Sequence, residues 1–435
     1  MKIFRAGNIR HFSLLVSISC WFLPLLNQAQ DSITLSYCYK QAELNYPLRQ
    51  QLEMFGNSST LKVKNLGKNY LPQFAVNGGV SLQSDVTKVA IEFPKGLSVP
   101  LMPALSKDWY KLTLDVNQAI YDGSITRYQK QVEGYNLQAD QKGVEIELYK
   151  LKDRINQIYF GIILLKENEK LLKSNKERIE AKLTEVQSGI KNGSVMEMNA
   201  DLLRAELVKL DQQLTETRMD QSASFKMLAE LISTPISETA SLVTPQITLP
   251  TVAFEDKRLE NELFTIQRSK VELMRNMLVT KWNPKIFAYG QAGYGRPNLN
   301  MLDDSFKPWW MFGAKISWSP WNWNQNKNDR QVLTIQSDIL RSQQETFDKN
   351  LKISSQKDLS EVMKYTELLA QDEQIIGLRK KITKTASSQL DNGVISPSDY
   401  IARLNEETLS LLNMEIHKIQ LIKAKLSYLY TLGKL

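Results

Sequence analysis

The chain has few residues of the kinds that catalyse reactions or bind metals. Among its 435 residues there are two cysteines and two histidines. Cys20 and His11 lie in a segment that we predict to be removed on export, which leaves Cys38 and His417. A disulfide within the chain then has no second cysteine. Metal clusters and catalytic triads built on cysteine or histidine have almost no residues to form them. We expect no enzyme, metal or cofactor, with Cys38 buried on the first helix and His417 on a helix surface.

Long hydrophobic runs are also lacking, except near the first residue. Three basic residues precede an apolar stretch from Phe12 to Leu26, and Ala29 follows shortly after it. This order predicts a signal peptide over residues 1–29 that is cleaved on export. A lipid anchor at Cys20 is the weaker reading, because the apolar stretch continues past that cysteine. No later segment has the length and apolarity of a transmembrane helix, so a membrane could be crossed only by strands.

Neither sign of charge is in large excess. The formal net charge is +8, and removing the three basic residues of the signal peptide lowers it to +5. So small a surplus, spread along the whole chain, does not indicate a nucleic-acid surface. We therefore expect no nucleic acid among the partners.

What the chain does contain is a long internal repeat. Residues 111–231 and 315–432 share the same order of strand, aromatic corner, long helix, Asn-Gly turn and returning helix. Gly193 and Gly393 in the two turns are 200 residues apart. A repeat of this size is a structural half rather than a solenoid unit. We predict a first repeat over residues 30–250 and a second over residues 251–435.

Four segments alternate between apolar and polar residues, which is typical of strands with two different faces. From Phe74 to Leu82, for example, every second residue is apolar or small. The predicted strands cover about 73–82 and 110–118 in the first repeat, and about 285–294 and 311–319 in the second. A length of about ten residues is what a tilted membrane strand needs.

Long helical segments separate the strand pairs. The sequence predicts helical hairpins over about 124–232 and 325–432, whose longer arms would extend roughly 100 Å at 1.5 Å per residue. In the first long arm, apolar residues recur at alternating spacings of four and three, the pattern of a coiled-coil seam. This stripe comprises Val144, Leu148, Leu151, Ile155, Ile158, Ile162 and Leu165.

Tryptophan outside the signal peptide is confined to the strand segments and their borders. Amphipathic aromatic rings collect at membrane–water interfaces, and a strand of about ten residues would hold the clusters at its two ends roughly 25 Å apart. The predicted interface aromatics are Trp109, Tyr110, Trp309, Trp310, Trp318, Trp321 and Trp323. The alternative is a soluble sheet with aromatic corners.

Four strands cannot close a barrel. Open sheet edges are not tolerated in hydrocarbon, because each unpaired backbone group costs several kcal/mol. If these strands enter a membrane, several copies of the chain must share one barrel. Hydrogen bonding alone therefore predicts a homo-oligomer, without fixing the number of copies.

Together these features resemble the TolC-like outer-membrane factors, the exit ducts of efflux pumps and type I secretion systems. The resemblance covers essentially the whole chain after the signal peptide. It rests on the order of the elements and on Leu71-Pro72-Gln73, Asn283-Pro284-Lys285, the corner from Asn117 to Gly123, and the turn glycines Gly193 and Gly393. The second corner, Ser319 to Asn324, keeps the family's proline but lacks its Asp-Gly pair, which leaves the local geometry there open.

The resemblance implies a mainly α-helical fold with a small transmembrane β part. In a homotrimer, twelve strands would form one shared outer-membrane β-barrel, and the helices would form a long periplasmic barrel closed by the tip turns. An acidic gate is implied just after the second turn, where Asp399 lies and Ala402 replaces the family's second acid. Asp391 is a nearby candidate, and the weaker candidates in the first half are Glu197 and Asp201, the latter expected on a solvated face.

The residues at the second turn have a simpler interpretation as well. Ser396, Pro397 and Asp399 match an N-cap serine, a proline at the first helical position and an acid three residues after the cap. Ser194 and Glu197 would form the matching box in the first half. Since these serines are 202 residues apart and the turn glycines 200, the sequence predicts two extra residues in the second turn. It would then be the moving gate, and the first turn the fixed wall.

The resulting hypothesis is a passive, non-enzymatic channel of an efflux pump or secretion system, located in the outer membrane with a periplasmic extension. Its strands would contact outer-membrane lipid. Its tip would dock to a periplasmic adaptor protein and an inner-membrane transporter through Asn192, Gly193, Ser194, Asn392, Gly393, Ser396 and Pro397. The alternative is a periplasmic coiled-coil adaptor or structural spacer, which would have one hairpin with lipoyl-like and barrel domains rather than two hairpins and four strands.

Overall fold

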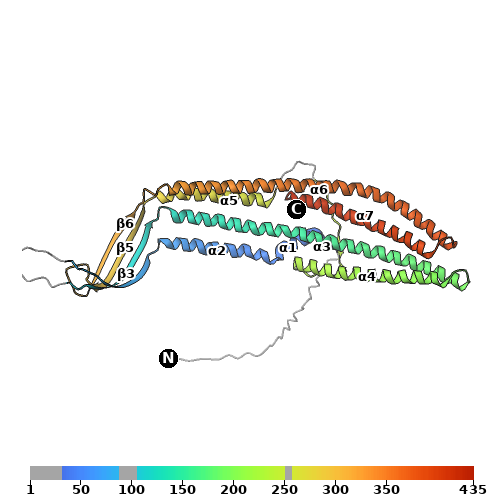
Figure 1. The fold of residues 1–435 in the computed structure, drawn as a ribbon, viewed down its shortest axis with the longest axis horizontal. Coiled ribbons are helices and arrows are strands. Elements are labelled where there is room, and N and C mark those ends of the chain that lie inside the picture. Colours follow the sequence, from blue (N-terminus) through green and yellow to red (C-terminus); the bar gives the residue numbers. More distant parts are fainter. Residues whose placement is uncertain (1–31, 88–104, 250–256) are drawn as a thin grey trace, which may run out of the picture.

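The computed structural model describes residues 32–87, 105–249 and 257–435. The predicted signal peptide, with Cys20 and His11, lies outside these residues. The described part is long and narrow, with a four-stranded sheet at one end and helices along the rest (Figure 1). The predicted fold class, mainly helical with a small β part, is confirmed. No helix in the described ranges combines the length and apolar composition that crossing a bilayer requires.

The first half begins with a short strand and two helices before its long strands and its hairpin. Its elements are β1 (Ser32–Ile33), α1 (Leu35–Asn45), α2 (Gln50–Gly67), β2 (Gln73–Leu82), β3 (Asp108–Tyr121), α3 (Ile125–Lys191), α4 (Glu197–Ile232) and β4 (Ser241–Leu242). A 3₁₀ turn over Pro47–Arg49 separates α1 from α2, because proline cannot donate the next helical hydrogen bond. β1 pairs in parallel with β4.

The second half repeats the order of a helix, two long strands and a helical hairpin. Its elements are α5 (Leu259–Met277), β5 (Lys285–Arg296), β6 (Lys307–Ser317), α6 (Gln325–Asp391) and α7 (Pro397–Thr431). The long helices α3 and α6 each have 67 residues. Strand β6 begins at Lys307, four residues before its predicted start at Met311. The prediction missed these residues because Pro308 and two adjacent tryptophans interrupt the alternation. Pro308 is nevertheless paired with Tyr294.

The four long strands form one antiparallel sheet in the order β2-β3-β5-β6. The halves therefore meet where β3 pairs with β5. Among the described residues, β2 and β6 each have one edge without a partner strand. The sheet thus remains open in a single copy of the chain.

The helices form a layer around α3 and α6. Figure 1 shows α2 and α5 beside the parts of these helices nearest the sheet, and α4 and α7 beside the parts nearest the tips. Most of the predicted stripe on α3 is core, since Val144, Leu148, Leu151, Ile155 and Ile162 are buried. Ile158 packs against the cluster that contains Ile155 and Ile162, and Leu165 is half-buried. Cys38 is fully buried, as expected.

The two halves keep a constant register of 200 residues from the corner to the end of the hairpin. Residues with positive φ occur in matching pairs, namely Gly123 and Trp323, Ser124 and Asn324, Gly193 and Gly393, and Ser233 and Gly433. Helix α3 ends at Lys191 and α4 begins at Glu197, while α6 ends at Asp391 and α7 begins at Pro397. The prediction of two extra residues in the second turn is therefore wrong.

Candidate functional site

One face of the sheet is apolar across all four strands. Residues paired directly across strands lie on the same face, and the register places Val76, Leu114 and Ala292 in one row. Trp310 completes this row, and further rows run from Gly78 to Pro308 and from Phe74 to Phe312. Besides the polar Gln118 near the helix end, the face comprises Phe74, Val76, Gly78, Val80, Tyr110, Leu112, Leu114, Val116, Ile286, Ala288, Gly290, Ala292, Tyr294, Pro308, Trp310, Phe312, Ala314 and Ile316. Phe312 is 78% exposed and Val76 is 72% exposed. An exposed apolar face of this extent requires a lipid or protein partner.

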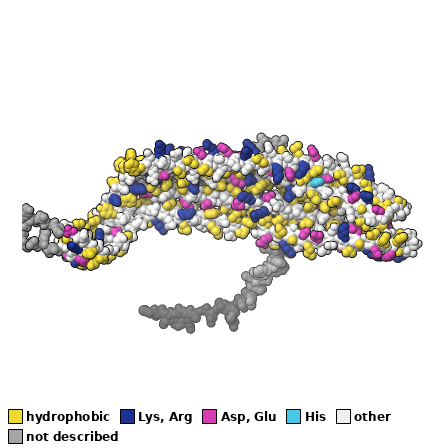
Figure 2. Space-filling view, viewed as in Figure 1, with side chains coloured by type: hydrophobic (Ala, Val, Ile, Leu, Met, Phe, Trp, Pro, Cys, Tyr) yellow, Lys and Arg dark blue, Asp and Glu magenta, His cyan; other side chains and the backbone are white. Residues whose placement is uncertain are grey.

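Figure 2 shows hydrophobic side chains over the strands at the left end of the molecule. The charged side chains of the strands near this face are Asp108 and Arg296, at the ends farthest from the helices. These two form an ion pair with each other. The middle of the apolar face is thus free of charge within β2, β3, β5 and β6, as a lipid-facing surface must be.

The opposite face is polar and centres on Asp115. Its carboxylate accepts hydrogen bonds from Asn77 Nδ2 at 2.5 Å, from Thr113 Oγ1 at 3.1 Å and from Gln291 Nε2. The three donors come from β2, β3 and β5, so the carboxylate joins three strands across the face. A polar face of this kind can line a water-filled space.

The predicted interface aromatics do not all lie on one face. Tyr110 and Trp310 belong to the apolar face, whereas Trp109 and Trp309 point to the polar face. Trp309 covers Gly293, where an added Cβ would overlap the indole ring. Trp318 donates a hydrogen bond from Nε1 to the carbonyl of Trp282 at 3.0 Å.

Trp321 and Trp323 lie at the corner between β6 and α6. They are 71% and 85% exposed, and their rings pack edge to face with centroids 5.8 Å apart. With Trp318 they leave three exposed indoles at the helix end of the sheet. Trp310 is 69% exposed toward the other end of β6, so the apolar face has aromatic rings at both of its borders.

At the far end of the molecule, both hairpins turn through the same Schellman motif. Gly193 donates to the carbonyl of Ile190 and Gly393 to that of Leu390, and both glycines have positive φ. Ser194 N donates to Gly189 O, as Val394 N donates to Gln389 O. The Asn-Gly pairs at both tips are thus explained by the left-handed residue that this motif needs.

The predicted capping box at Ser396 is present, and the one predicted at Ser194 is not. Ser396 caps α7, with its hydroxyl accepting from Asp399 N at 3.2 Å and its own N–H donating to Asp399 Oδ2 at 3.1 Å. In the first half the N-cap is Met196, which has no side-chain cap. Ser194 lies two residues too early, and its hydroxyl donates to Gly189 O, so it closes α3 rather than opening α4.

Asp399 is solvent-exposed and lines an open groove between α6 and α7. The groove is lined by Lys381, Ile382, Thr385, Ala386, Gln389, Ile395, Asp399 and Arg403. Hydrogen bonds from Ser396 lower the pKa of Asp399, so the carboxylate is charged at neutral pH. It can therefore serve as a cap and present a negative charge at the same time.

Asp391 joins the two hairpins. Its Oδ1 accepts from Lys182 Nζ at 2.5 Å, and the same ammonium group lies 2.5 Å from Glu185 Oε2. Burial alone would lower the pKa of Lys182, but these two hydrogen bonds outweigh it and raise the pKa. A second link between the hairpins is the bidentate pair of Arg178 and the buried Glu407, at 3.0 and 3.3 Å.

Glu197 and Asp201 lie together on the exposed side of α4. Both pair with Arg204 Nη1, at 3.0 and 2.8 Å, and both are more than half exposed. Asp201 is thus solvated, as expected. His417 differs from its prediction as a surface residue, because its Nδ1 lies 2.6 Å from the buried Asp372 and joins α7 to α6.

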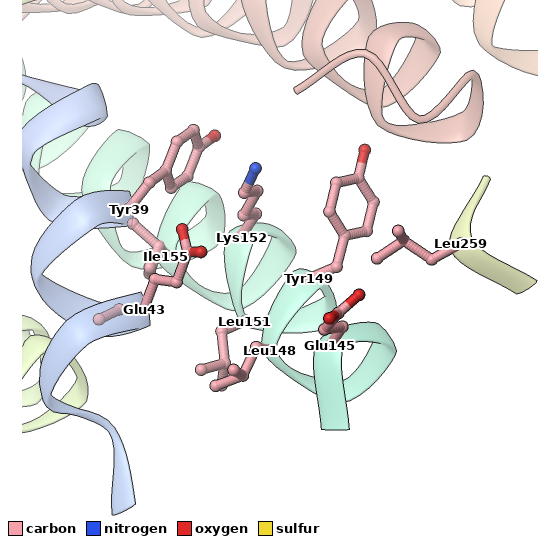
Figure 3. Close-up of a pocket in the computed structure, with 10 residues that line it drawn as sticks. Tyr39, Glu43, Glu145, Leu148, Tyr149, Leu151, Lys152, Ile155 and Leu259 are labelled. Atoms are coloured by element: carbon pink, nitrogen blue, oxygen red, sulfur yellow. The ribbon is translucent and has the colours of Figure 1, made fainter. Parts of the chain in front are cut away.

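A cavity of about 250 Å³ lies where α1 meets α3 (Figure 3). Tyr39 of α1 and Tyr149 and Lys152 of α3 extend to the same side of it. Lys152 Nζ lies over both rings and donates to the main-chain oxygen of Leu435 at 2.6 Å, and burial lowers its pKa. Lys152 thus binds the segment after α7, whereas Tyr149 donates to the carbonyl of Tyr430 in α7 and Tyr39 donates to Asn156 in α3.

Sequence reasoning did not find Asp115, Lys182 or Glu407. Asp115 could have been found, because it falls on the polar side of a recognised alternation. The ion pair of Lys182 with Asp391 carries no local signal, since the two residues are 209 positions apart. No group of three or more metal-ligating side chains occurs among the residues that the structure describes.

No protein-family model matches this chain, and no curated protein matches its sequence. Solved structures do match its fold. The outer membrane protein VceC of Vibrio cholerae is 12% identical, with a TM-score of 0.64 over 92% of this chain and 96% of that one. The CmeC outer membrane channel of Campylobacter jejuni is 15% identical, with a TM-score of 0.64 over 92% and 85%. The open state of the MtrE outer membrane channel of Neisseria gonorrhoeae is 14% identical, with a TM-score of 0.60 over 92% and 88%. The chain has the fold of these outer-membrane proteins along nearly its whole length.

Proposed function

We propose that this chain is one subunit of a passive duct in the outer membrane, which serves as the exit of a tripartite efflux pump or a type I secretion system. Three copies would share one barrel of twelve strands, and their helices would continue it into the periplasm. The duct would carry solutes or polypeptides without chemistry of its own. Energy would come from an inner-membrane transporter, joined through a periplasmic adaptor.

The observation that carries this proposal is a sheet with one apolar face, one polar face and two open edges, mounted on helices that extend far beyond it. In hydrocarbon the free edges of β2 and β6 must be paired. Because the sheet is antiparallel throughout, β6 of one copy would run antiparallel to β2 of the next. Identical copies can therefore close a ring with one pairing rule, and the fold shared with outer-membrane channels supports this arrangement.

The aromatic rings support the same placement. Tyr110 and Trp310 would lie at one membrane interface, and Trp318, Trp321 and Trp323 at the other. Trp109 and Trp309 would face the lumen instead, because they lie on the polar side of the sheet. The predicted signal peptide would direct export.

The tips would be both the docking surface and the gate. The exposed apolar side chains there, Met196 at 74% and Val394 at 68%, are available to a partner beside Asn192, Gly193, Asn392 and Gly393. Asp399 would place a negative charge at the constriction. The charge of Asp391 would contribute less, because Asp391 forms an ion pair with Lys182.

The alternative of a coiled-coil adaptor or spacer is not favoured. An adaptor has no need for four strands that expose an apolar face, and an isolated open sheet of this kind would aggregate in water. The chain also has two hairpins in constant register, which suits a closed ring better than a single extended spacer.

The test is to purify the full chain from outer membranes in detergent. We expect an oligomer that resists mild SDS and dissociates on heating, and that conducts ions in planar bilayers. A monomer that stays soluble without detergent would contradict the proposal. In a conducting oligomer, Asp399→Ala should weaken block by divalent cations, and unchanged block would exclude Asp399 as the gate residue.

A further inference from the structure

Basic residues dominate the polar face of the sheet. In β2, β3, β5 and β6 the charged side chains on this face are Lys111, Lys285, Lys307 and Lys315, against the single acid Asp115. The pairing register fixes this placement, because Lys111 and Lys307 both face Gly295, and Lys315 faces Phe287. Each copy thus contributes an excess of three positive charges to this face.

Most of these ammonium groups are not neutralised by acids. Lys307 pairs with Asp303 at 2.5 Å, in the segment between β5 and β6. Lys111 Nζ lies 5.1 Å from the centre of the Trp309 ring, which holds the cation without cancelling its charge. For Lys285 and Lys315, no carboxylate lies within ion-pair distance among the residues that the structure describes.

Asp115 is already subtracted in this excess of three charges. Its carboxylate is turned toward Asn77, Thr113 and Gln291, which donate hydrogen bonds to it. Asp115 is four residues from Lys111 along β3. It is farther from Lys285 and Lys315, which lie near the helix end of the sheet. The lysines therefore act at both ends of the strands, with the acid between them.

The dimensions of a shared barrel make these charges effective. Twelve strands spaced about 4.8 Å apart and tilted about 40° would enclose a barrel with a radius of about 12 Å. The Debye length is about 10 Å at 0.1 M salt and about 3 Å at 1 M. The lysines would therefore act across the lumen at low ionic strength and lose this reach at high ionic strength.

We propose that the outer-membrane end of the duct is a cationic vestibule that favours the passage of anionic solutes over cationic ones. Lys111, Lys285 and Lys315 are its specificity-determining residues. A positive wall concentrates counter-ions, so solutes bearing carboxylate, phosphate or sulfate groups enter this section preferentially. This inference rests on the proposed function, because the polar face becomes a lumen only in the closed oligomer.

The test reads the electrostatic potential at one point on the lumen wall. Ser317 faces Lys285 across β5 and β6, so Ser317→Cys places a thiol beside the two lysines at the helix end. Cys38 is fully buried and gives no background reaction. The measurement is the ratio of the reaction rates of an anionic and a cationic methanethiosulfonate reagent with the full-length oligomer in detergent.

We expect this ratio to be at least about fivefold higher at 0.1 M than at 1 M salt in the Ser317→Cys chain. Adding Lys285→Gln and Lys315→Gln should lower the 0.1 M ratio by about fivefold, and the matched Lys285→Arg and Lys315→Arg pair should leave it unchanged. In bilayers, the chloride-to-potassium permeability ratio should fall when Lys111→Gln is added as well.

A heat-labile, conducting oligomer whose reagent ratio responds neither to salt nor to the glutamine substitutions would overturn the vestibule and leave the duct intact. If no conducting oligomer forms, the proposed function itself fails. The two failures are therefore distinguishable in one preparation.

Discussion

Trp323 has a backbone conformation that the first half gives to glycine. Its φ is 51°, and that of its counterpart Gly123 is 76°. The corner of the second half therefore keeps the geometry of the first although it lacks the Asp-Gly pair. A left-handed conformation costs a residue with a Cβ about 1–2 kcal/mol. The proposed interface role of the exposed Trp323 ring would explain why this cost is tolerated.

In the first half, the corner is held by side-chain hydrogen bonds. Asp122 accepts from Tyr70 Oη at 2.7 Å, Ser124 N at 2.9 Å and Thr126 N at 2.8 Å. Burial alone would raise the pKa of Asp122, but these donors outweigh it and lower the pKa. The carboxylate thus satisfies the free N–H groups at the start of α3.

Gly123→Ala should destabilise the protein by about 1–2 kcal/mol. The glycine has positive φ, and an added Cβ would approach Asn283 Cβ and Thr280 O to 3.2 Å. The matched control is Gly143→Ala within α3, where nothing lies within 4 Å and alanine should stabilise the helix by about 0.5–1 kcal/mol. Thermal unfolding followed by helical circular dichroism measures both, and shifts of the same sign would contradict this account.

The tip turns differ in their caps although they share one backbone path. Ser396→Ala should remove the side-chain acceptor at the start of α7 and cost about 1 kcal/mol, whereas Ser194→Ala removes only a bond that closes α3. Hydrogen exchange of the first turn of α7 should accelerate about fivefold in Ser396→Ala. Hydrogen exchange of the first turn of α4 should be unchanged in Ser194→Ala. Equal acceleration in both variants would instead indicate that each serine caps the helix that follows it.

The hairpin of α3 and α4 should depend on pH through Glu169. Hydrogen bonds from Lys173, Gln221 and Arg218 outweigh its partial burial and lower the pKa of Glu169 to about 2. Because the folded-state pKa lies below the unfolded value of about 4.3, the carboxylate stabilises the fold above that value and loses this contribution as pH falls toward 2. Thermal stability should therefore fall less between pH 5 and pH 2.5 in Glu169→Gln than in the unmodified chain. If stability depends on pH in the same way in both, other acids cause the loss.

The whole molecule depends on the two faces of its sheet. Phe312 and Met311 are neighbours at the same depth of β6, on the apolar and polar faces respectively. A lysine on a lipid-facing strand costs about 2–4 kcal/mol at the bilayer midplane, and on the lumen side it is tolerated. Phe312→Lys should therefore reduce the heat-labile oligomer in outer-membrane fractions, and Met311→Lys should not. Similar yields of both variants would argue against the lipid-facing assignment.

The sequence alone determined the elements that depend on local periodicity. Alternation between apolar and polar residues predicted β2 at its observed bounds, and the spacing of four and three predicted the buried stripe on α3. The Asn-Gly pairs marked both tips because only glycine readily supplies the positive φ of a Schellman motif. These signals are local, so they survive without knowledge of the neighbours.

Only the tertiary structure decided which segments become partners. It replaced the predicted cap at Ser194 with a bond back to Gly189, and it showed one constant register of 200 residues through both hairpins. It paired β3 with β5, which unites the two halves in one sheet. It also joined Lys182 to Asp391, 209 residues away. Such contacts depend on which helices and strands pack side by side. A long-range pair imposes no periodic pattern on the sequence around either partner, so local sequence cannot reveal it.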